Sequence, residues 1–374
     1  MSDNVNSFGE ANVVSTMNET DRKCPCCGGT MDYNPATGGL HCPYCDYDEE
    51  IKSATVETPN TGLSESAVEL ALEDADKIEN CDWGIATKTV ICKSCGAESI
   101  YDVQEISSVC PYCGSNQVME ANDERTMAPG GVVPFKITQE QASNRFVEWI
   151  KRKFFAPKLA KESAKADKFT GIYLPYWTFD AQTDSTYTGE YGKDRTVTDK
   201  DGNKRTVTDW YNTSGQYSEF IDDELVCGTT QHDTGMLRGL EPFDTADNKV
   251  YKPEYVAGFA AERYSVGIKA AWEKAKNAIT SKLRSAICSK ILREHNADHT
   301  RNVVIHTNYS KMTYKYLLLP IWMSSFKYND KVYRFMVNGQ NGKVSGQSPV
   351  SAIKVALTIL VIAAIIGLFI YLRS

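Results

Sequence analysis

The chain has 374 residues and a formal net charge of −7. The charge is divided unevenly, because residues 1–125 hold 23 acidic and 7 basic side chains, whereas residues 126–374 hold 25 and 34. An acidic surface repels the phosphate backbone that drives non-specific nucleic-acid binding, so the N-terminal part is poorly suited to that function. The basic C-terminal part suits the neighbourhood of an anionic membrane surface.

The chain begins with a polar segment, residues 1–20, which has no apolar run of the kind that a secretory signal peptide needs. We predict that this segment is disordered. We also expect that it does not direct export of the residues that follow.

Two groups of four cysteines come next. Each group consists of two C-x2-C pairs separated by 14 residues, and the second group repeats the first 68 positions later. Two such pairs on a short hairpin place four thiolates at the corners of a tetrahedron, which suits Zn²⁺. Disulfides are the alternative, but the identical spacing of both groups argues against them. The predicted metal ligands are Cys24, Cys27, Cys42, Cys45, Cys92, Cys95, Cys110 and Cys113.

Each predicted site has four protein ligands, so we expect two structural Zn²⁺ ions whose binding is coupled to the folding of two small β zinc ribbons. Glycine follows the second cysteine of three pairs, and Asp46 takes that place in the fourth, where a turn tends to need positive φ. Cys26 is a fifth thiol beside the first group, and the sequence leaves open whether it can act as a ligand. So many thiolates imply a reducing compartment, which points to a cytosol.

The sequence predicts a multidomain chain in which the ribbons precede an α+β domain with antiparallel sheet. In the linker we expect a short acidic helix over residues 64–78, with Ser66 and Glu69 at capping-box spacing. The predicted order is disorder over 1–20, a first ribbon over 21–50, the linker over 51–82, a second ribbon over 83–121, the α+β domain over 128–350 and a transmembrane helix over 353–372.

Within the α+β domain, apolar spacing predicts helices over 138–155 and 266–295. Each helix is followed by a Leu-Pro-x-Trp motif, at residues 174–177 and 319–322, which we expect to begin a strand with the proline at its first residue. Hairpins are predicted around residues 200–203 and 329–330. Two related halves explain this repetition, although chance similarity of the two motifs is an alternative.

The chain ends in an apolar run, residues 355–372, in which only Thr358 and Tyr371 are polar. As a helix this run extends about 27 Å, enough to cross the hydrocarbon core of a bilayer. A buried helix of a soluble core is the alternative, but such helices seldom lack a polar face. We therefore expect a single-pass tail anchor in the cell membrane, with the N-terminal bulk in the cytoplasm.

One acidic cluster, Asp222, Asp223 and Glu224, could form an acid–base or metal site with the nearby His232. The simpler interpretation is a solvated turn at the end of a strand. The sequence has no phosphate-binding loop and no nucleophile elbow, so we expect that the protein is not an enzyme.

Several segments carry a resemblance to a known family: the paired C-P-x-C-G knuckles and residues 220–226, 240–244, 257–264, 319–322 and 337–343. In these segments the chain resembles a family of bacterial membrane proteins with a transcription-factor-IIB-type zinc ribbon, often labelled as primosomal protein N′-like or helicase-like. Most of the chain takes part in the resemblance, but it has two ribbons where that family usually has one, and it lacks the nucleotide-binding motif of a helicase.

The resemblance implies a membrane-tethered adaptor that serves in envelope maintenance or stress. We expect the ribbons to bind protein partners, namely other membrane-associated proteins, through exposed residues of the hairpins. The alternative is that the aromatic residues of the hairpins cover the ribbon cores. The alternative function is a nucleic-acid-binding ribbon of replication or transcription. The candidate contact residues are Tyr33, Leu40, Tyr44, Ile100, Tyr101 and Tyr112.

Overall fold

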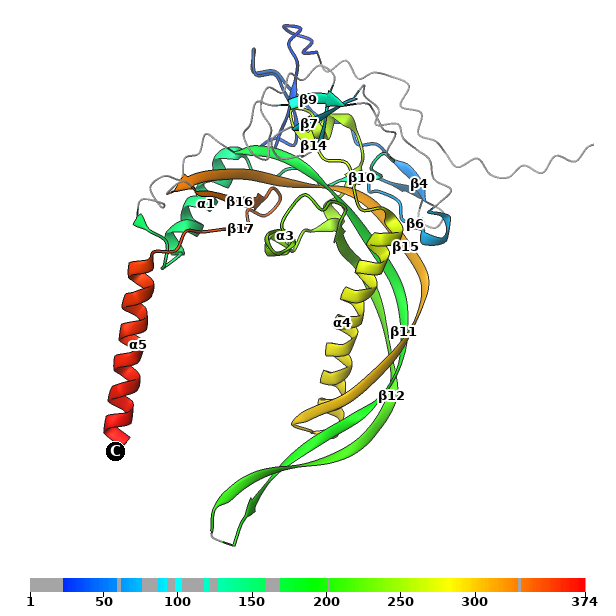
Figure 1. The fold of residues 1–374 in the computed structure, drawn as a ribbon. Helices are drawn as coiled ribbons and strands as arrows, with labels where there is room; N and C mark the ends of the chain where they lie inside the picture. The colour runs from blue at the N-terminus through cyan, green and yellow to red at the C-terminus, as the bar shows by residue number, and fades with distance from the viewer. Residues whose placement is uncertain are drawn as a thin grey trace, which may run out of the picture.

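The computed structural model shows a central body, a long curved arm and a terminal helix that stands apart from both (Figure 1). The arm comprises residues 182–221 and 299–310 together with the helix that covers them. The structure describes residues 23–58, 62–75, 87–92, 98–102, 118–121, 127–158, 169–200, 202–328 and 331–373.

Four α-helices and three 3₁₀ turns occur in the described residues. The helices are α1 (Gln139–Arg152), α3 (Thr234–Leu240), α4 (Ile268–His295) and α5 (Ala352–Arg373), and the turns are η1 (Leu72–Asp74), η3 (Thr245–Asp247) and η4 (Pro253–Val256). The predictions of helices over 138–155 and 266–295 are confirmed by α1 and α4. Thr138 caps α1 in a capping box with Gln141, which explains where this helix begins.

The strands form two small sheets and one large sheet. The small sheets contain β1 (Asp32–Asn34), β2 (Gly39–His41) and β3 (Asp48–Glu49), and β4 (Val56–Thr58) and β5 (Gly62–Ser64). The large sheet contains β6 (Leu70–Ala71), β7 (Thr87–Cys92), β8 (Glu98–Asp102), β9 (Val118–Ala121), β10 (Gly131–Val132), β11 (Thr170–Thr198), β12 (Lys204–Cys227), β13 (Lys249–Val250), β14 (Ala260–Ala261), β15 (His299–Tyr328), β16 (Lys331–Asn338) and β17 (Val344–Gly346).

Three long antiparallel strands, β11, β12 and β15, build the arm and continue into the body. The strands bend at bulges where one strand carries an extra residue, and the bulge residues Asp223, Asn302 and Lys311 all have positive φ. These bulges explain the curvature of the arm in Figure 1. Both predicted hairpins are present, since β11 turns into β12 and β15 turns into β16.

Helix α4 packs along the inner side of the curved arm (Figure 1). Its buried residues recur at every fourth position and so follow a ridge that winds around the helix. A winding stripe fits a twisted sheet better than a straight one would. The buried residues of α4 are Ala271, Ala275, Ile279, Leu283, Ile287 and Ile291.

The two Leu-Pro-x-Trp motifs lie side by side in the centre of the body, because Leu174 pairs with Leu319 in the β11–β15 ladder. The indole of Trp177 donates to the carbonyl of Val266, two residues before α4, over 2.8 Å. The indole of Trp322 donates to the carbonyl of Ile137, two residues before α1, over 2.7 Å. Each tryptophan therefore fixes the start of the helix that belongs to the other half.

Further contacts repeat this reciprocal arrangement. Strand β10 runs parallel to β15, and β14 runs parallel to β11 at the matching position of the other half. The amide of Gly228 donates to the carbonyl of Pro175, and the amide of Gly339 donates to that of Pro320, both over 2.8 Å. The two halves of the domain thus repeat one arrangement in which each half completes the other.

The prolines do not begin their strands as predicted. Pro175 and Pro320 lie inside β11 and β15, which start at Thr170 and His299. The carbonyl of each proline accepts a hydrogen bond from a glycine, and the proline nitrogen, which has no hydrogen, faces the same side of the strand. For Pro175, this side of β11 is the gap between its pairing with β14 and its pairing with β12, so no N–H donor is needed there.

The acidic helix predicted over 64–78 is also wrong for residues 64–75, which contain β6 and η1 instead. Tertiary contacts override the local pattern here. Strand β6 pairs with Thr313 and Tyr314 of β15, and the amide of Ala67 donates to the side chain of Asn248 over 2.7 Å. These bonds hold the segment extended across the domain.

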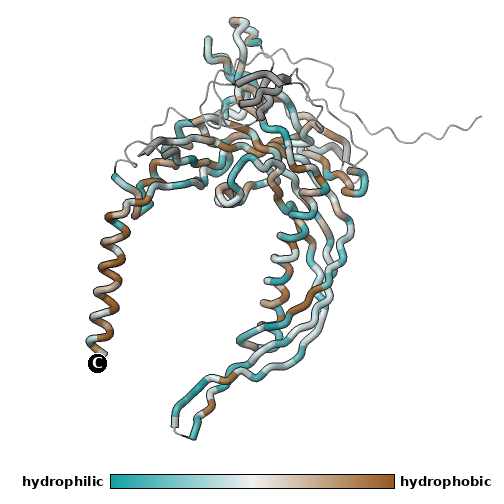
Figure 2. Tube along the Cα trace, viewed as in Figure 1, coloured by the Kyte–Doolittle hydropathy of each residue, from teal (hydrophilic) through white to brown (hydrophobic). Residues whose placement is uncertain are grey.

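Helix α5 is apolar along nearly its whole length (Figure 2). Residues 352–372 are long and apolar enough to span a membrane, with a mean hydropathy of 2.9 over the most apolar part, and none of that part is buried. An exposed helix of this length and composition is suited to crossing a bilayer, which weakly indicates a membrane anchor.

Candidate metal centre

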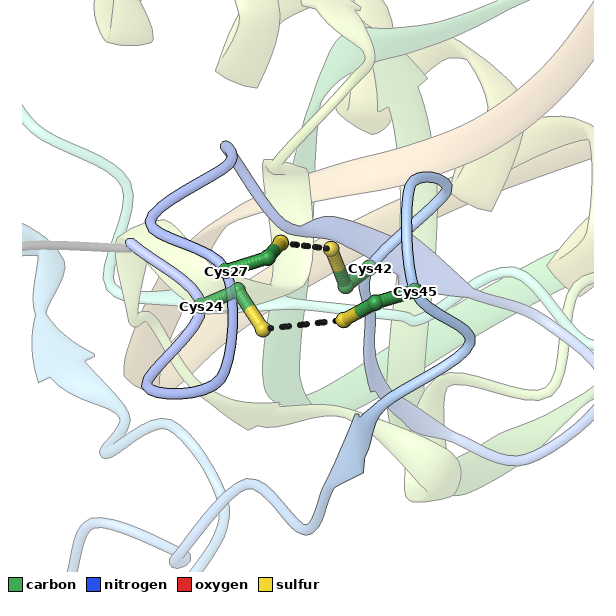
Figure 3. A group of neighbouring side chains, drawn as sticks. All are labelled: Cys24, Cys27, Cys42 and Cys45. Carbon is green, nitrogen blue, oxygen red and sulfur yellow. Dashed lines mark hydrogen bonds between the residues drawn. The ribbon is translucent and has the colours of Figure 1, made fainter.

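The first group of cysteines is brought together as predicted (Figure 3). The sulfurs of Cys24, Cys27, Cys42 and Cys45 all lie within 4.8 Å of one another, and the closest pairs are 3.4 and 3.5 Å apart. A tetrahedral Zn²⁺ with Zn–S distances of about 2.3 Å places its sulfurs about 3.8 Å apart. The cluster could therefore bind a metal ion of this kind.

Two matching turns hold the four thiols. In the first turn the amide of Cys24 donates to the carbonyl of Gly29, and in the second the amide of Cys42 donates to that of Tyr47. Gly28 and Asp46 follow the second cysteine of each pair, with φ of 73° and 58°. The expected positive φ at both positions is thus confirmed, and β1 and β2 form the hairpin between the turns.

The thiols also influence one another's ionisation. The hydrogen bond to Cys24 is the main cause that raises the pKa of Cys45 to about 12. Burial acts against ionisation of Cys24, but hydrogen bonds from the amides of Cys26 and Cys27 and from the side chains of Cys45 and Cys42 together lower its pKa to about 7. Four thiols this close cannot all ionise unless a cation lies between them, which is the chemistry of a zinc–thiolate centre.

Cys26 is exposed and its sulfur does not belong to the cluster, although its amide donates to the sulfur of Cys24. The second group of cysteines cannot be compared in the same way. Cys92 ends strand β7, and Cys95, Cys110 and Cys113 lie outside the described residues. The second metal site therefore stays a prediction.

The first ribbon is fixed to the α+β domain by residues on one of its faces. Tyr33 is buried, its amide donates to the carbonyl of Ala257, and its hydroxyl donates to the carbonyl of Phe135 over 3.2 Å. Its ring also meets Tyr255 edge-on, and burial raises the pKa of Tyr33 well above its usual range. Tyr33 and Leu40 are thus buried, so the hypothesis that they contact a partner is wrong.

The strands of the second ribbon region approach the same part of the domain. Ile100 of β8 pairs with Ala261 of β14. Ala261 lies only four residues after Ala257, whose carbonyl accepts the hydrogen bond from the amide of Tyr33. Segment 255–261 is therefore a common platform for both N-terminal regions. Tyr101 belongs to β8 and Tyr112 lies outside the described residues, whereas Tyr44 is 75% exposed.

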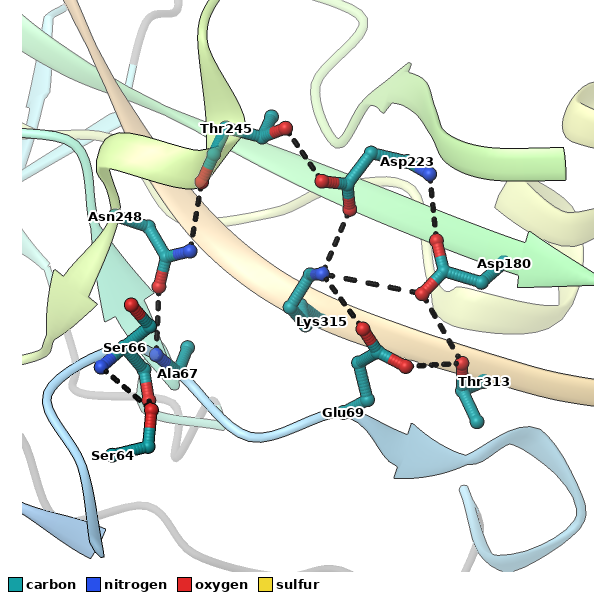
Figure 4. A network of polar contacts seen from close by, with 10 residues as sticks. All are labelled: Ser64, Ser66, Ala67, Glu69, Asp180, Asp223, Thr245, Asn248, Thr313 and Lys315. Atoms are coloured by element: carbon teal, nitrogen blue, oxygen red, sulfur yellow. Dashed lines mark hydrogen bonds and ion pairs between the residues drawn. The ribbon is translucent and has the colours of Figure 1, made fainter. Parts of the chain in front are cut away.

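The acidic cluster is not a solvated turn at a strand end, because it forms a bulge inside β12. Asp222 is exposed, while the carboxylate of Asp223 forms an ion pair with the ammonium of Lys315 at 2.8 Å. The same ammonium lies 3.2 Å from Glu69 and 4.0 Å from Asp180 (Figure 4). The carboxylates of Asp180, Asp222 and Asp223 lie close enough to hold a metal, but Lys315 already supplies the positive charge.

This network has one acid that favours its protonated form. Burial raises the pKa of Asp180 to about 7, and the neighbouring carboxylate of Glu69 adds to the rise. Burial acts against ionisation of Asp223 too, but its bonds to Lys315 and Thr245 lower its pKa overall. Glu69 comes from the linker, so the network joins the linker to the body.

His232 does not join these acids. Its Nε2 lies 2.9 Å from the carboxylate of Glu262, and both side chains are buried. A cavity of about 770 Å³ between α3 and α4 is lined by residues that include Glu224 and Cys227, but not by Asp222, Asp223 or His232. The residues of the suggested acid–base site therefore do not come together in one site.

Comparison with known proteins finds a similar sequence. The chain is 28% identical over 340 residues to "Uncharacterized protein YdjG" of Bacillus subtilis (strain 168), which covers 89% of this chain and 91% of that protein. No family model and no solved structure matches the chain. The similarity spans nearly the full length of both proteins.

Proposed function

We propose that the protein is a membrane-tethered adaptor without catalytic activity, in which two Zn²⁺-binding ribbons present a binding surface to a protein partner. Helix α5 crosses the cell membrane and keeps the other domains in the cytoplasm. The observation that carries the proposal is the combination of a closed four-thiol cluster with an apolar, unburied terminal helix. A closed site leaves no ligand position for substrate, so its zinc has a structural role.

The free side of the first ribbon is the proposed contact surface. Tyr44 is largely exposed there, and the acidic residues that follow it in sequence, Asp46, Asp48, Glu49 and Glu50, are exposed as well. A ribbon that exposes an aromatic ring and several acids suits a partner with a basic, partly apolar surface. Since the opposite side of the ribbon is fixed to the domain, this surface is presented rigidly.

The arm has to remain in water. Figure 1 shows α5 and the arm extending from the body in the same direction, yet the far end of the arm carries exposed charges such as Lys193, Arg195 and Lys204. Charged side chains are costly in hydrocarbon. Insertion of α5 therefore requires this helix to turn away from the arm. The link at residues 347–351 has almost no regular structure and lies where the turn would occur.

Two experiments on the full-length protein test the proposal. After cell fractionation, the protein should be found in the membrane fraction and should resist extraction by high salt. Photo-crosslinking in native membranes should then recover a protein partner. Recovery of the whole protein in the soluble fraction would contradict the tether.

A matched pair of variants tests the contact surface. Tyr44→Ala should lose the crosslinked partner, whereas Tyr211→Ala, which removes a tyrosine that is 47% exposed on the arm, should retain it. A partner that both variants retain would show that the ribbon surface is not the contact. Binding of nucleic acid instead of protein would favour the alternative function.

A further inference from the structure

We propose that the C-terminal end of α1 and the residues after it, 149–158, form a second membrane contact that binds the anionic headgroup layer beside α5. This contact rests on the proposed insertion of α5. The segment reads Trp-Ile-Lys-Arg-Lys-Phe-Phe-Ala-Pro-Lys, with four cations and no acid. We call it the basic–aromatic segment.

Three hydrogen bonds tie the basic–aromatic segment to the first turn of α5. The amide of Ser351 donates to the carbonyl of Phe155 over 2.8 Å. The ammonium of Lys354 donates to the carbonyls of Phe154 and Ala156, each over 2.9 Å. Two segments that are 200 residues apart in sequence are thereby held together where the apolar helix begins.

These bonds also set the depth of the segment. Lys354 is the last charged residue before the apolar run that begins at Val355, so its ammonium marks the boundary between headgroups and hydrocarbon. Because the segment's carbonyls bind that ammonium, the segment lies at the same level. When the chain turns at residues 347–351, α5 reorients as a whole, and the long, flexible side chain of Lys354 can keep its contacts with the segment.

The aromatic residues of the segment expose ring surface that a membrane interface could cover. Phe154 is 68% exposed and Phe155 is 39% exposed, and their rings meet edge-on at 5.2 Å. The ring of Phe154 lies 5.8 Å from the ammonium of Lys354. Aromatic rings at the headgroup level beside an apolar helix are typical of membrane-interface anchors.

The charges of the segment indicate which lipids it prefers. Lys151, Arg152 and Lys153 are consecutive and exposed, and the ammonium of Lys153 lies 4.5 Å from the centre of the Trp149 ring. Each basic residue close to an anionic membrane surface favours binding by about fivefold. Phosphatidylglycerol and similar anionic lipids are therefore the expected ligands.

Site-specific crosslinking tests the contact. The photoreactive residue p-benzoylphenylalanine replaces Phe154 in the full-length protein, which is reconstituted in phosphatidylcholine vesicles with or without phosphatidylglycerol. The matched control carries the same residue in place of Tyr44, which is also well exposed but lies on the ribbon, remote from α5 in Figure 1. We expect lipid crosslinks at position 154 and none at position 44.

A charge variant tests the lipid preference. Lys151→Gln, Arg152→Gln and Lys153→Gln together should lower the yield at position 154 several-fold in vesicles with phosphatidylglycerol and leave it unchanged in neutral vesicles. Protein that floats with vesicles but gives no lipid crosslink at position 154 would overturn the second contact alone. Protein that does not float would overturn the insertion of α5 and this contact together.

Discussion

The first ribbon and the α+β domain solve the problem of folding in different ways. The ribbon has three short strands and a few buried side chains, whereas the domain buries large clusters of aromatic and aliphatic residues around β11 and β15. We expect that a module as small as the ribbon needs a metal to fold, whereas a core as large as that of the domain should not. Metal removal should therefore unfold the ribbon and leave the domain folded.

The largest expected effect is therefore that of Cys42→Ser, which removes a fully buried thiol of the cluster. Zinc binding contributes about 10 kcal/mol or more to the folding of small zinc modules, so residues 23–50 should unfold. Limited proteolysis should show new cleavage in this range and an intact domain. Cys26→Ser is the control, because this neighbouring thiol lies outside the cluster. Equal protection of both variants would argue against the metal centre.

A second substitution separates the ribbon from its platform. Tyr33→Ala removes a buried ring and should cost the docked state about 3–5 kcal/mol. Tyr33→Phe removes only the hydrogen bond to Phe135, which should cost about 1 kcal/mol. Hydrogen exchange in segment 255–261 should become much faster in Tyr33→Ala and slightly faster in Tyr33→Phe, while zinc stays bound in both variants. Unchanged exchange in the alanine variant would mean that the ribbon does not depend on this contact.

The reciprocal halves of the domain predict a pair of equal effects. Trp177→Phe and Trp322→Phe each leave one helix-start carbonyl without its indole donor, and each should lower the free energy of unfolding by about 1–3 kcal/mol. Trp272→Phe should have a smaller effect, because this ring is only partly buried. Chemical denaturation of the three variants measures the differences. A large loss in only one of the first two would show that the halves are not equivalent.

The smallest expected effect concerns the pH dependence of the linker network. The folded protein holds the Asp180 proton more tightly than the unfolded chain does, so this stabilisation is present below pH 4 and lost as the pH rises through about 7. Asp180→Asn removes that dependence and should raise the melting temperature relative to wild type by a few degrees at pH 8 but not at pH 5. The exposed Asp222→Asn is the control. A lower melting temperature of Asp180→Asn at pH 8 would contradict the raised pKa.

The sequence predicts the parts of the molecule that depend on local spacing. Helices α1 and α4, both hairpins and the first cysteine cluster follow from patterns within a few dozen residues. The reciprocal pairing does not, because the contacts of Trp177 and Trp322 join segments that are far apart in the chain. A sign was present in the two Leu-Pro-x-Trp motifs, but spacing alone cannot show that they pair with each other.

Long-range contacts also explain several predictions that the structure overturns. Residues 64–78 have a helical pattern, but pairing with β15 and the bond from Ala67 to Asn248 keep residues 64–75 extended. Tyr33 is an aromatic residue on a ribbon hairpin, which in isolation predicts a free contact surface. Only the folded domain shows that the platform at 255–261 covers it. Lys315, which neutralises the acidic cluster, lies more than 90 residues from Asp223 and could not be paired with it from sequence.

The most direct test of the central claim is the zinc content of the full-length protein purified from membranes. We expect two equivalents of zinc per chain in wild type, one equivalent in Cys42→Ser, and release of metal as the pH falls and the thiolates are protonated. Absence of zinc in the wild-type protein, or the same zinc content in Cys42→Ser, would contradict it.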